Sequence, residues 1–235
     1  MQVRRRLLSR VAFRLLHPFL RRSHFKQGDF VTFRPEGFVA ADDPSALLCR
    51  NYYEVKRLRQ YLARMSELGV SGGRSLEIGC GYGRLSAYIA EYFEEHSAID
   101  INRWALSRAR QCYPNISFVQ GSATALPFAD QTFDLVVSWT VLQHLPNHLV
   151  GKALNELIRV AKTNSLILLC EATFYADQQE STAHTHDRSP DFYARSLSPR
   201  PLLVSEYLSE LDEIPNMVSP GRLMLFGPAV VVSST

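Results

Sequence analysis

Residues 75–86, Ser-Leu-Glu-Ile-Gly-Cys-Gly-Tyr-Gly-Arg-Leu-Ser, constrain the fold more than any other stretch of the chain. Apolar residues first alternate as in a buried strand, glycines then take every second position, and a helical pattern follows. Glycine has no Cβ and adopts positive φ easily, so Gly79, Gly81 and Gly83 would let a ligand approach the backbone. This order predicts the first unit of a parallel α/β sheet, which binds ligands at the carboxyl ends of its strands.

The glycine spacing separates two kinds of nucleotide-like ligand. A dinucleotide-binding turn reads G-x-G-x-x-G, and its third glycine permits close packing of the helix on the strand. Arg84 stands at that third position here, and the last glycine comes one residue earlier. The run from Glu77 to Gly83 instead resembles the first motif of class I S-adenosylmethionine (SAM)-dependent methyltransferases, E/D-x-G-x-G-x-G.

A second segment strengthens this resemblance. Residues 126–138, Leu-Pro-Phe-Ala-Asp-Gln-Thr-Phe-Asp-Leu-Val-Val-Ser, closely resemble the phrase that leads into the fourth strand in the methyltransferase type 11 branch. The resemblance covers roughly residues 45–235. It implies that Glu77 meets the amino-acid part of SAM, and that the cofactor is bordered by Gly79, Cys80, Gly81 and Gly83.

The next expected strand, His96–Asp100, ends in an acid about 20 residues after the glycine turn. An acid at this spacing is placed to accept hydrogen bonds from ribose hydroxyls, so we predict that Asp100 and the adjacent Ile101 bind cofactor. The alternative is that Asp100 caps the helix that follows. After the strand Ile116–Gln120, Ser122 stands where the family commonly has an acid that contacts adenine. A serine hydroxyl also accepts this hydrogen bond, and we include Ser122 and Ala123 in the predicted cofactor site.

The segment Trp139–Leu145 borders the transferred methyl group in the resembling fold, which adds Trp139 to the cofactor site and Gln143 to the substrate site. His144 is the predicted general base for a hydroxyl acceptor, because histidine titrates near neutral pH. The alternative is that His144 only packs or caps the loop.

A predicted helix, Ala46–Leu68, lies over the mouth of the site in the resembling family. Its Tyr52 and Tyr53 are therefore candidate substrate contacts, although an aromatic face packed on the sheet is an equal alternative. Arg188 is a candidate to hold an anionic substrate group or a neighbouring carboxylate.

We predict no metal site. His184, His186 and Asp187 could bind a divalent ion, but this spacing in a polar loop is more typical of solvated side chains. The cysteines Cys49, Cys80, Cys112 and Cys170 form no C-x-x-C pair, which indicates a reducing, cytoplasmic location.

The chain begins with a basic segment. Residues 1–28 hold eight of the 26 basic residues and no acid, which leaves 18 basic against 23 acidic residues in the rest of the chain. Residues 3–17 combine an apolar stripe with an arginine row that predicts an amphipathic helix. Three interpretations stay open for it: peripheral contact with an anionic membrane, a transit peptide, or a helix docked on its own domain. The acidic body argues against nucleic acid as a partner.

The remaining patterns predict helices at Arg103–Cys112, Asn147–Val160 and Asp191–Leu197, and strands at Phe30–Phe33, Phe133–Ser138, Leu166–Cys170, Ser205–Leu211 and Leu223–Phe226. We expect an α/β fold with a doubly wound, mostly parallel sheet over residues 45–235, and an N-terminal extension over residues 1–44. The predicted function is transfer of a methyl group from SAM to a small-molecule or lipid-linked acceptor. An NAD-dependent oxidoreductase and a catalytically silent SAM-fold subunit are the alternatives.

Overall fold

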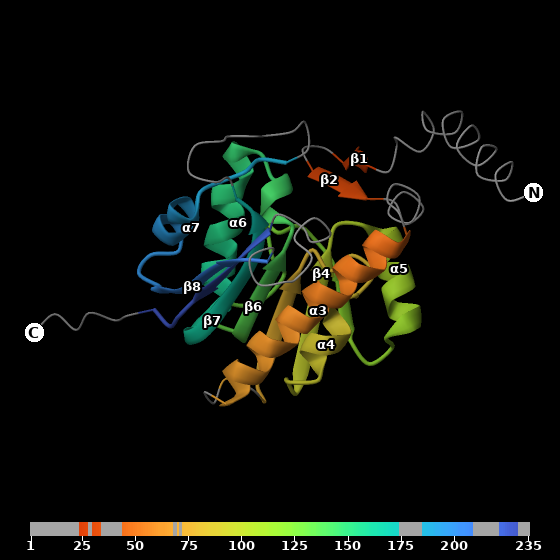
Figure 1. Cartoon of the computed structure of the whole chain (residues 1–235), viewed down its shortest axis with the longest axis horizontal. Helices are drawn as coiled ribbons and strands as arrows, with labels where there is room; N and C mark the ends of the chain where they lie inside the picture. The colour runs from red at the N-terminus through yellow and green to blue at the C-terminus, as the bar shows by residue number, and fades with distance from the viewer. Residues whose placement is uncertain are drawn as a thin grey trace, which may run out of the picture.

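The computed structural model describes residues 24–27, 30–33, 44–67, 70, 72–173, 185–208 and 221–229. Its main body is a seven-stranded sheet in the order β5-β4-β3-β6-β7-β9-β8 (Figure 1). The strands are β3 (Arg74–Ile78), β4 (Glu95–Asp100), β5 (Ser117–Gln120), β6 (Phe133–Trp139), β7 (Ala161–Ala172), β8 (Leu202–Tyr207) and β9 (Gly221–Phe226). The predicted doubly wound, mostly parallel α/β fold is confirmed.

The first strand of this sheet along the chain, β3, lies near its middle, and the later strands are added first on one side of β3 and then on the other. Strands β3, β4 and β5 pair in parallel toward one edge, and β6 and β7 then pair in parallel on the other side of β3. The last hairpin is antiparallel, since β9 lies between β7 and β8. The strand order therefore reverses between β3 and β6, and this switch point is where open α/β sheets bind ligands.

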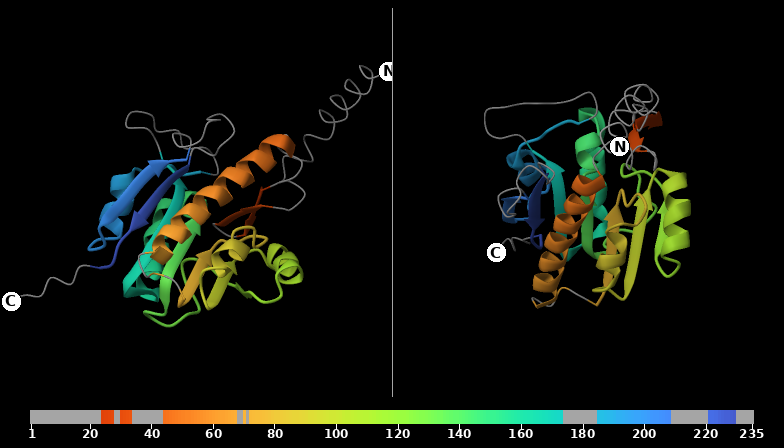
Figure 2. Two further views of the ribbon diagram at one scale, coloured as in Figure 1. Left: turned by 60° about the horizontal axis from the view of Figure 1, so that its bottom comes forward. Right: turned by 45° about the vertical axis from the view of Figure 1, so that its right-hand side comes forward.

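Helices cover both faces of the sheet, as Figure 2 shows. The helices α3 (Pro44–Glu67), α4 (Ser86–Ala90) and α5 (Arg103–Cys112) lie on one face, and α6 (Asn147–Val160) and α7 (Pro190–Ser196) lie on the other. Successive side chains of a strand point to opposite faces of the sheet, so each strand contacts both groups of helices. On β6, Leu135 and Val137 pack with α3 and α4, whereas Val136 packs with α6. Both faces of the central strands are buried, which explains their nearly continuous apolar sequences.

Two short strands lie outside the main sheet. The strands β1 (His24–Gln27) and β2 (Phe30–Phe33) form an antiparallel pair, and β2 confirms the strand expected there. The predicted amphipathic helix at residues 3–17 falls outside the described residues. The division of the chain at residue 44 stays a prediction.

Three elements differ from their predicted bounds by three residues or more. The helix after the glycine turn, whose apolar pattern predicts that it runs through Phe93, ends at Ala90. The Tyr92 N–H donates to the Ile89 carbonyl and the Tyr92 carbonyl accepts from the Gly72 N–H, which turns the chain into β4. Strand β7 begins directly where α6 ends, five residues earlier than expected. The prediction of a strand at Ser205–Leu211 was wrong in its bounds. Pairing with β9 places the strand at Leu202–Tyr207, and local sequence does not reveal that pairing.

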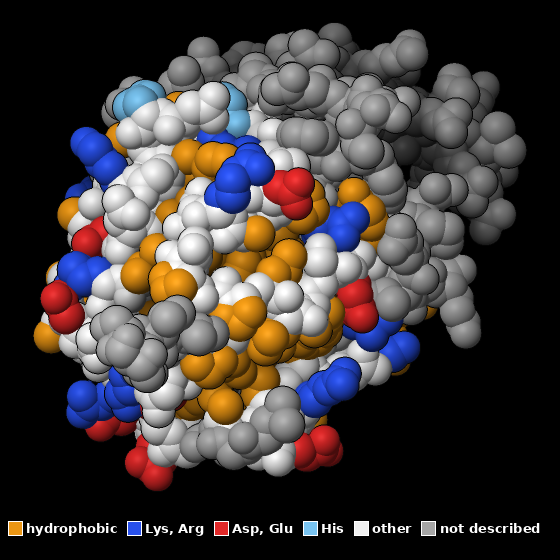
Figure 3. Space-filling model, turned by 90° about the vertical axis from the view of Figure 1, so that its left-hand side faces the viewer, with side chains coloured by type: hydrophobic (Ala, Val, Ile, Leu, Met, Phe, Trp, Pro, Cys, Tyr) orange, Lys and Arg blue, Asp and Glu red, His pale blue; other side chains and the backbone are white. Residues whose placement is uncertain are grey.

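Strand β8 is the edge of the sheet on the side that Figure 3 views. Hydrophobic side chains gather near the middle of this face, with basic and acidic side chains around them. Leu203 of β8 is 54% exposed.

Candidate functional site

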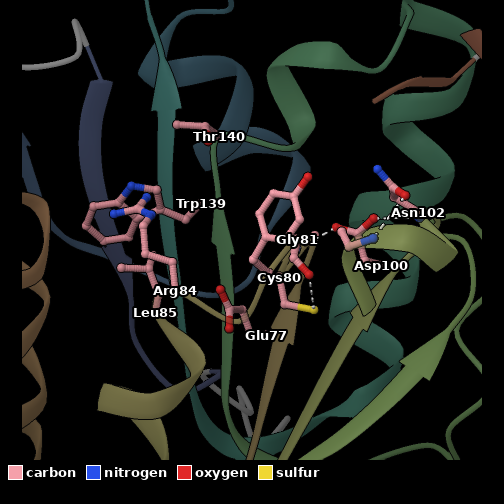
Figure 4. A pocket seen from close by; sticks show the side chains of 12 residues that line it. Glu77, Cys80, Gly81, Arg84, Leu85, Asp100, Asn102, Trp139 and Thr140 are labelled. Atoms are coloured by element: carbon pink, nitrogen blue, oxygen red, sulfur yellow. Dashed lines mark hydrogen bonds between the residues drawn. The ribbon is translucent and has the colours of Figure 1, made fainter. Parts of the chain in front are cut away.

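A cavity of about 320 Å³ opens where β3, β4 and β6 end, at the switch point of the sheet (Figure 4). This volume lies at the lower end of the range for ligand pockets. Six predicted cofactor residues line it: Glu77, Gly79, Cys80, Gly81, Asp100 and Trp139. Six further lining residues were not predicted: Tyr82, Arg84, Leu85, Asn102, Ala105 and Thr140.

Glu77 supplies a buried carboxylate from the end of β3. The Glu77 Oε2 atom accepts a hydrogen bond from the Ser86 hydroxyl, and Glu77 is only 3% exposed. Beneath it, Ser75 Oγ lies 2.9 Å from His96 Nδ1, and His96 Nε2 lies 3.9 Å from Glu77 Oε2 without a hydrogen bond in the described part of the chain. A carboxylate held this way favours a cationic or N–H ligand group in the cavity.

Asp100 supplies a second carboxylate, from the end of β4. Its Oδ2 accepts from the Gly81 N–H at 2.8 Å and its Oδ1 accepts from the Asn102 N–H at 2.7 Å. Burial raises the pKa of Asp100, although these N–H groups act in the opposite direction. Asp100 is not the helix cap, because the Asn102 side chain accepts from the N–H groups of Trp104 and Ala105 at the start of α5.

The three glycines have different surroundings, although all have positive φ. A Cβ at Gly81 would meet no atom within 4 Å. A Cβ at Gly79 would collide with Val141 Cγ2, and one at Gly83 would lie 2.8 Å from Phe118 Cζ. Only Gly81 therefore leaves open space for a ligand; the other two allow protein segments to pack closely. Gly83 does not line the cavity.

The end of β6 forms the opposite wall. Trp139 is 4% exposed, and its Nε1 is buried without a hydrogen-bond acceptor in the described chain. Thr140 follows with a left-handed φ of 56°, and its N–H donates to the Cys170 carbonyl at 2.6 Å. An unsatisfied N–H beside a cavity is a second mark of a polar ligand site.

A fully buried carboxylate, Glu171 of β7, supports this wall. It accepts from Ser138 Oγ at 2.7 Å and from the N–H groups of Val141 and Gln143 at 3.3 and 3.1 Å. Burial raises the pKa of Glu171 to about 7. These contacts hold the segment that carries Trp139 and Thr140 against β7.

Four predicted cofactor residues do not line the cavity: Gly83, Ile101, Ser122 and Ala123. The Ser122 hydroxyl lies 2.8 Å from Thr124 Oγ1 and accepts from the Thr124 N–H. Ala123 packs in the hydrophobic core. The cofactor-binding roles of these residues, including the contact of Ser122 with adenine, stay predictions.

The predicted substrate and catalytic residues also lie outside the lining of the cavity. Gln143 Oε1 accepts from the Ala172 N–H at 2.6 Å, and Gln143 Nε2 lies 3.3 Å from His144 Nε2. Arg188 donates to the carbonyls of Leu142, Leu145 and His186, so its guanidinium braces the loop after β6. The assignments of Gln143, His144 and Arg188 to substrate or base roles stay predictions.

The two tyrosines of α3 differ in environment. Tyr52 is 60% exposed and stands edge-on to Tyr53, with 5.3 Å between ring centroids. Tyr53 packs against the core beneath α3. Their substrate role likewise stays a prediction. No group of three potential metal ligands occurs in the residues the structure describes, and His184 lies outside them.

The site residues that the sequence analysis did not predict have only weak local sequence patterns. Asn102 directly before a helical pattern is a recognisable cap, and it could have placed the helix start. Arg84 and Glu171 act through partners 30 residues or more away in the chain, Glu54 and Ser138. No local pattern contains such contacts.

Comparisons with known proteins agree with this geometry. A family model described as "Methyltransferase domain" matches residues 76–164. A fatty-acid O-methyltransferase of Mycolicibacterium smegmatis is 30% identical over 150 residues, which are 61% of this chain and 54% of that protein. The chain carries a class I SAM-dependent methyltransferase domain. This assignment replaces the dinucleotide-binding alternative, while membership of the type 11 branch stays a prediction.

Two further comparisons describe the methyltransferase domain. A demethylmenaquinone methyltransferase of Renibacterium salmoninarum is 34% identical over 102 residues, 43% of this chain and 42% of that protein. The chain thus spans about half the length of these curated relatives, or less. Among solved structures, a SAM-dependent methyltransferase of Leishmania major has a TM-score of 0.62 and 16% identity, and the match covers 75% of this chain and 72% of that one. This last likeness shows the fold alone.

The cavity of the methyltransferase domain fits SAM chemically. Glu77 and Asp100 offer two carboxylates, for an amino group and for hydroxyls, and Gly81 leaves space where a side chain would stand. The unsatisfied Trp139 N–H offers a donor on the opposite wall. The residues of this structure therefore match the polar groups of the cofactor that its family uses.

Proposed function

We propose that this chain is a methyltransferase that moves a methyl group from SAM to a small-molecule or lipid-linked acceptor. The observation that carries the proposal is that one cavity at the switch point joins Glu77 of β3, Gly81 of the turn and Asp100 of β4. Class I methyltransferase sequence motifs surround all three residues.

The chain's own residues would bind and orient the two reactants. SAM, when bound, supplies a methyl group that its sulfonium has already activated. Glu77 would hold the amino group of its methionine part, and Asp100 would hold the ribose hydroxyls. Trp139 and Leu85 supply apolar surface in the cavity, which favours exclusion of water. Positioning and loss of water contribute most of the acceleration in such displacements.

The acceptor we favour is an apolar molecule that ends in a carboxylate. One relative is named a fatty-acid O-methyltransferase, and another is named for demethylmenaquinone, so both names describe apolar acceptors. A carboxylate is already ionised at neutral pH and needs no general base. This fits a cavity whose described lining contains no histidine, since His144 lies outside it.

The test is methyl transfer by the full chain with radiolabelled SAM. Hexadecanoic acid and a demethylated menaquinol are offered in parallel, and label in the organic extract is counted. We expect label in the methyl ester of the fatty acid. Label in the quinone alone would contradict the carboxylate preference. SAM binding without transfer to any acceptor would favour a catalytically silent subunit.

We further propose that residues 3–17 contact an anionic membrane surface, as their arginine row and apolar stripe favour. A transit peptide and a docked helix stay as alternatives. In the described chain no helix is both long and apolar enough to cross a bilayer. The cytoplasmic location and the absence of nucleic-acid partners stay predictions.

A further inference from the structure

Arg84 is the only lysine or arginine among the described residues that line the cavity. It directly follows the glycine turn, at the position where a dinucleotide-binding motif would have its third glycine. The other charged lining residues are Glu77 and Asp100, both acidic. The cavity therefore offers one cationic group and two anionic groups to a ligand.

The guanidinium of Arg84 is held by helix α3. Its Nη2 donates to Glu54 Oε2 at 2.6 Å, and its Nη1 donates to Asn51 Oδ1 at 3.0 Å. A guanidinium carries five N–H donors, so these two contacts leave three for other acceptors. The Arg84 side chain is 33% exposed, whereas that of Glu54 is 1% exposed. Arg84 is thus oriented by the protein and still accessible from the cavity.

The order of the charged groups matches the order of the groups in SAM. In Figure 4, Arg84 and Trp139 lie on one side of the pocket, Asp100 and Asn102 lie on the other, and Glu77 lies between them. SAM carries an α-carboxylate and an α-amino group at its methionine end and a ribose toward its other end. If Asp100 takes the ribose and Glu77 takes the amino group, the carboxylate lies on the side of Arg84.

We propose that Arg84 binds the α-carboxylate of the methionine part of SAM, and that Glu54 and Asn51 of α3 hold its guanidinium in place for this contact. The inference rests on the proposed function, because it names a contact within the same site. Arg84 and Glu77 together then recognise the zwitterionic amino-acid end of the cofactor. A charged bidentate acceptor is the ligand group that arginine binds best.

A purely structural role is the competing explanation. Glu54 is fully buried, and an unpaired buried carboxylate is costly, so Arg84 could serve only to neutralise it. The two roles differ in which ligands they affect. A carboxylate-binding arginine discriminates between ligands with and without that carboxylate, whereas a neutralising arginine affects both equally.

The experiment uses titration calorimetry of the full chain with three probes: S-adenosylhomocysteine, its analogue lacking the α-carboxylate, and 5′-methylthioadenosine. The wild type should bind S-adenosylhomocysteine roughly ten- to a hundredfold more tightly than the decarboxylated analogue, as for hydrogen bonds to charged groups. In Arg84→Gln this ratio should fall to about one, with the affinity for 5′-methylthioadenosine nearly unchanged. Arg84→Lys should keep part of the ratio, because it retains the charge.

Two matched variants separate the roles. Glu54→Gln removes the buried charge but keeps an oxygen that can accept from Arg84, so it should keep the preference for the carboxylate. Arg59→Gln removes another contact of α3, the exposed pair with Glu91, and should change none of the three affinities. Equal losses of affinity for all three probes in Arg84→Gln would overturn the inference.

The wild type alone decides the matter if the Arg84 variants fail to fold. Equal binding of S-adenosylhomocysteine and its decarboxylated analogue would overturn the role of Arg84 while leaving SAM binding intact. Failure of the folded wild type to bind any of the three probes would instead overturn the proposed function.

Discussion

The Asp100 carboxylate accepts a hydrogen bond from the backbone N–H of Gly81 at 2.8 Å. This contact joins the end of β4 to the turn after β3, and the second Asp100 oxygen accepts from the Asn102 N–H at the start of α5. One side chain therefore fixes the relative positions of two loops that line the cavity. Its remaining lone pairs are available to a ligand.

Asp100→Asn should weaken SAM binding by roughly ten- to a hundredfold, because it removes the charge that strengthens two ligand hydrogen bonds. The amide nitrogen also cannot accept from a backbone N–H. Titration with 5′-methylthioadenosine should show a similar loss, since this probe keeps the ribose. An unchanged dissociation constant would limit Asp100 to joining the two loops.

Gly81→Val should abolish SAM binding while the fold is retained. The branched side chain would extend into open space of the cavity, at a φ of 52° that costs on the order of 1 kcal/mol for a residue with a Cβ. Calorimetry and thermal unfolding measure the two effects separately. Near-normal affinity in the folded variant would show that no ligand approaches Gly81.

Gly83→Ala is the matched control, because its Cβ would collide with Phe118 rather than enter the cavity. Overpacking of this kind typically costs about 1–3 kcal/mol. We expect a lower melting temperature for Gly83→Ala, with SAM affinity little changed at temperatures where it is folded.

Glu171→Gln should change how stability depends on pH. The pKa of Glu171 in the folded chain is about 7, above its value in the unfolded chain. Its stabilising contribution is therefore fully present below about pH 4.5 and is lost as the pH rises through 7, by about 3 kcal/mol in total. Wild type should lose stability relative to Glu171→Gln between pH 5 and pH 8 in urea unfolding. Parallel pH profiles for the two proteins would contradict this.

Glu156→Gln is expected to change the pH dependence of stability in the opposite direction. Hydrogen bonds from Arg159 lower the pKa of Glu156, so its contribution is present above its unfolded pKa and is lost as the pH falls. The variant should be less stable than wild type at pH 7, and the difference should shrink toward pH 3. A difference that is constant with pH would show that the charge is not involved.

Replacing Arg6, Arg10 and Arg14 with Gln should weaken binding to anionic liposomes without changing SAM affinity. Each basic residue near such a surface contributes about 1 kcal/mol, so binding should also fall as salt is added. Co-sedimentation of wild type and variant measures this. Wild type that ignores anionic liposomes at low salt would contradict membrane contact, and a lower melting temperature of the variant would favour a docked helix.

The parallel core of the sheet could be predicted from sequence because its determinants are local. Apolar alternation, the glycine turn and the acid at the end of β4 lie within segments of a few residues, and the structure brings Glu77, Gly81 and Asp100 into one cavity. Strand β8 could not be placed correctly, since its bounds depend on pairing with β9 about 20 residues later.

The less local parts of the site were not predictable in the same way. Arg84 was identified only as a departure from a dinucleotide motif, yet its contacts with α3 lie 30 and 33 residues earlier in the chain. Ser122 follows a correctly expected strand, but its hydroxyl is hydrogen-bonded to Thr124 and does not line the cavity. Side-chain direction in such loops depends on tertiary packing.

The most direct test of the account is a crystal structure of the full chain with S-adenosylhomocysteine. We expect the ligand in the cavity between β3, β4 and β6, with its amino group at Glu77 and its ribose hydroxyls at Asp100. A ligand bound elsewhere, or one in the cavity that contacts neither carboxylate, would contradict the central claim.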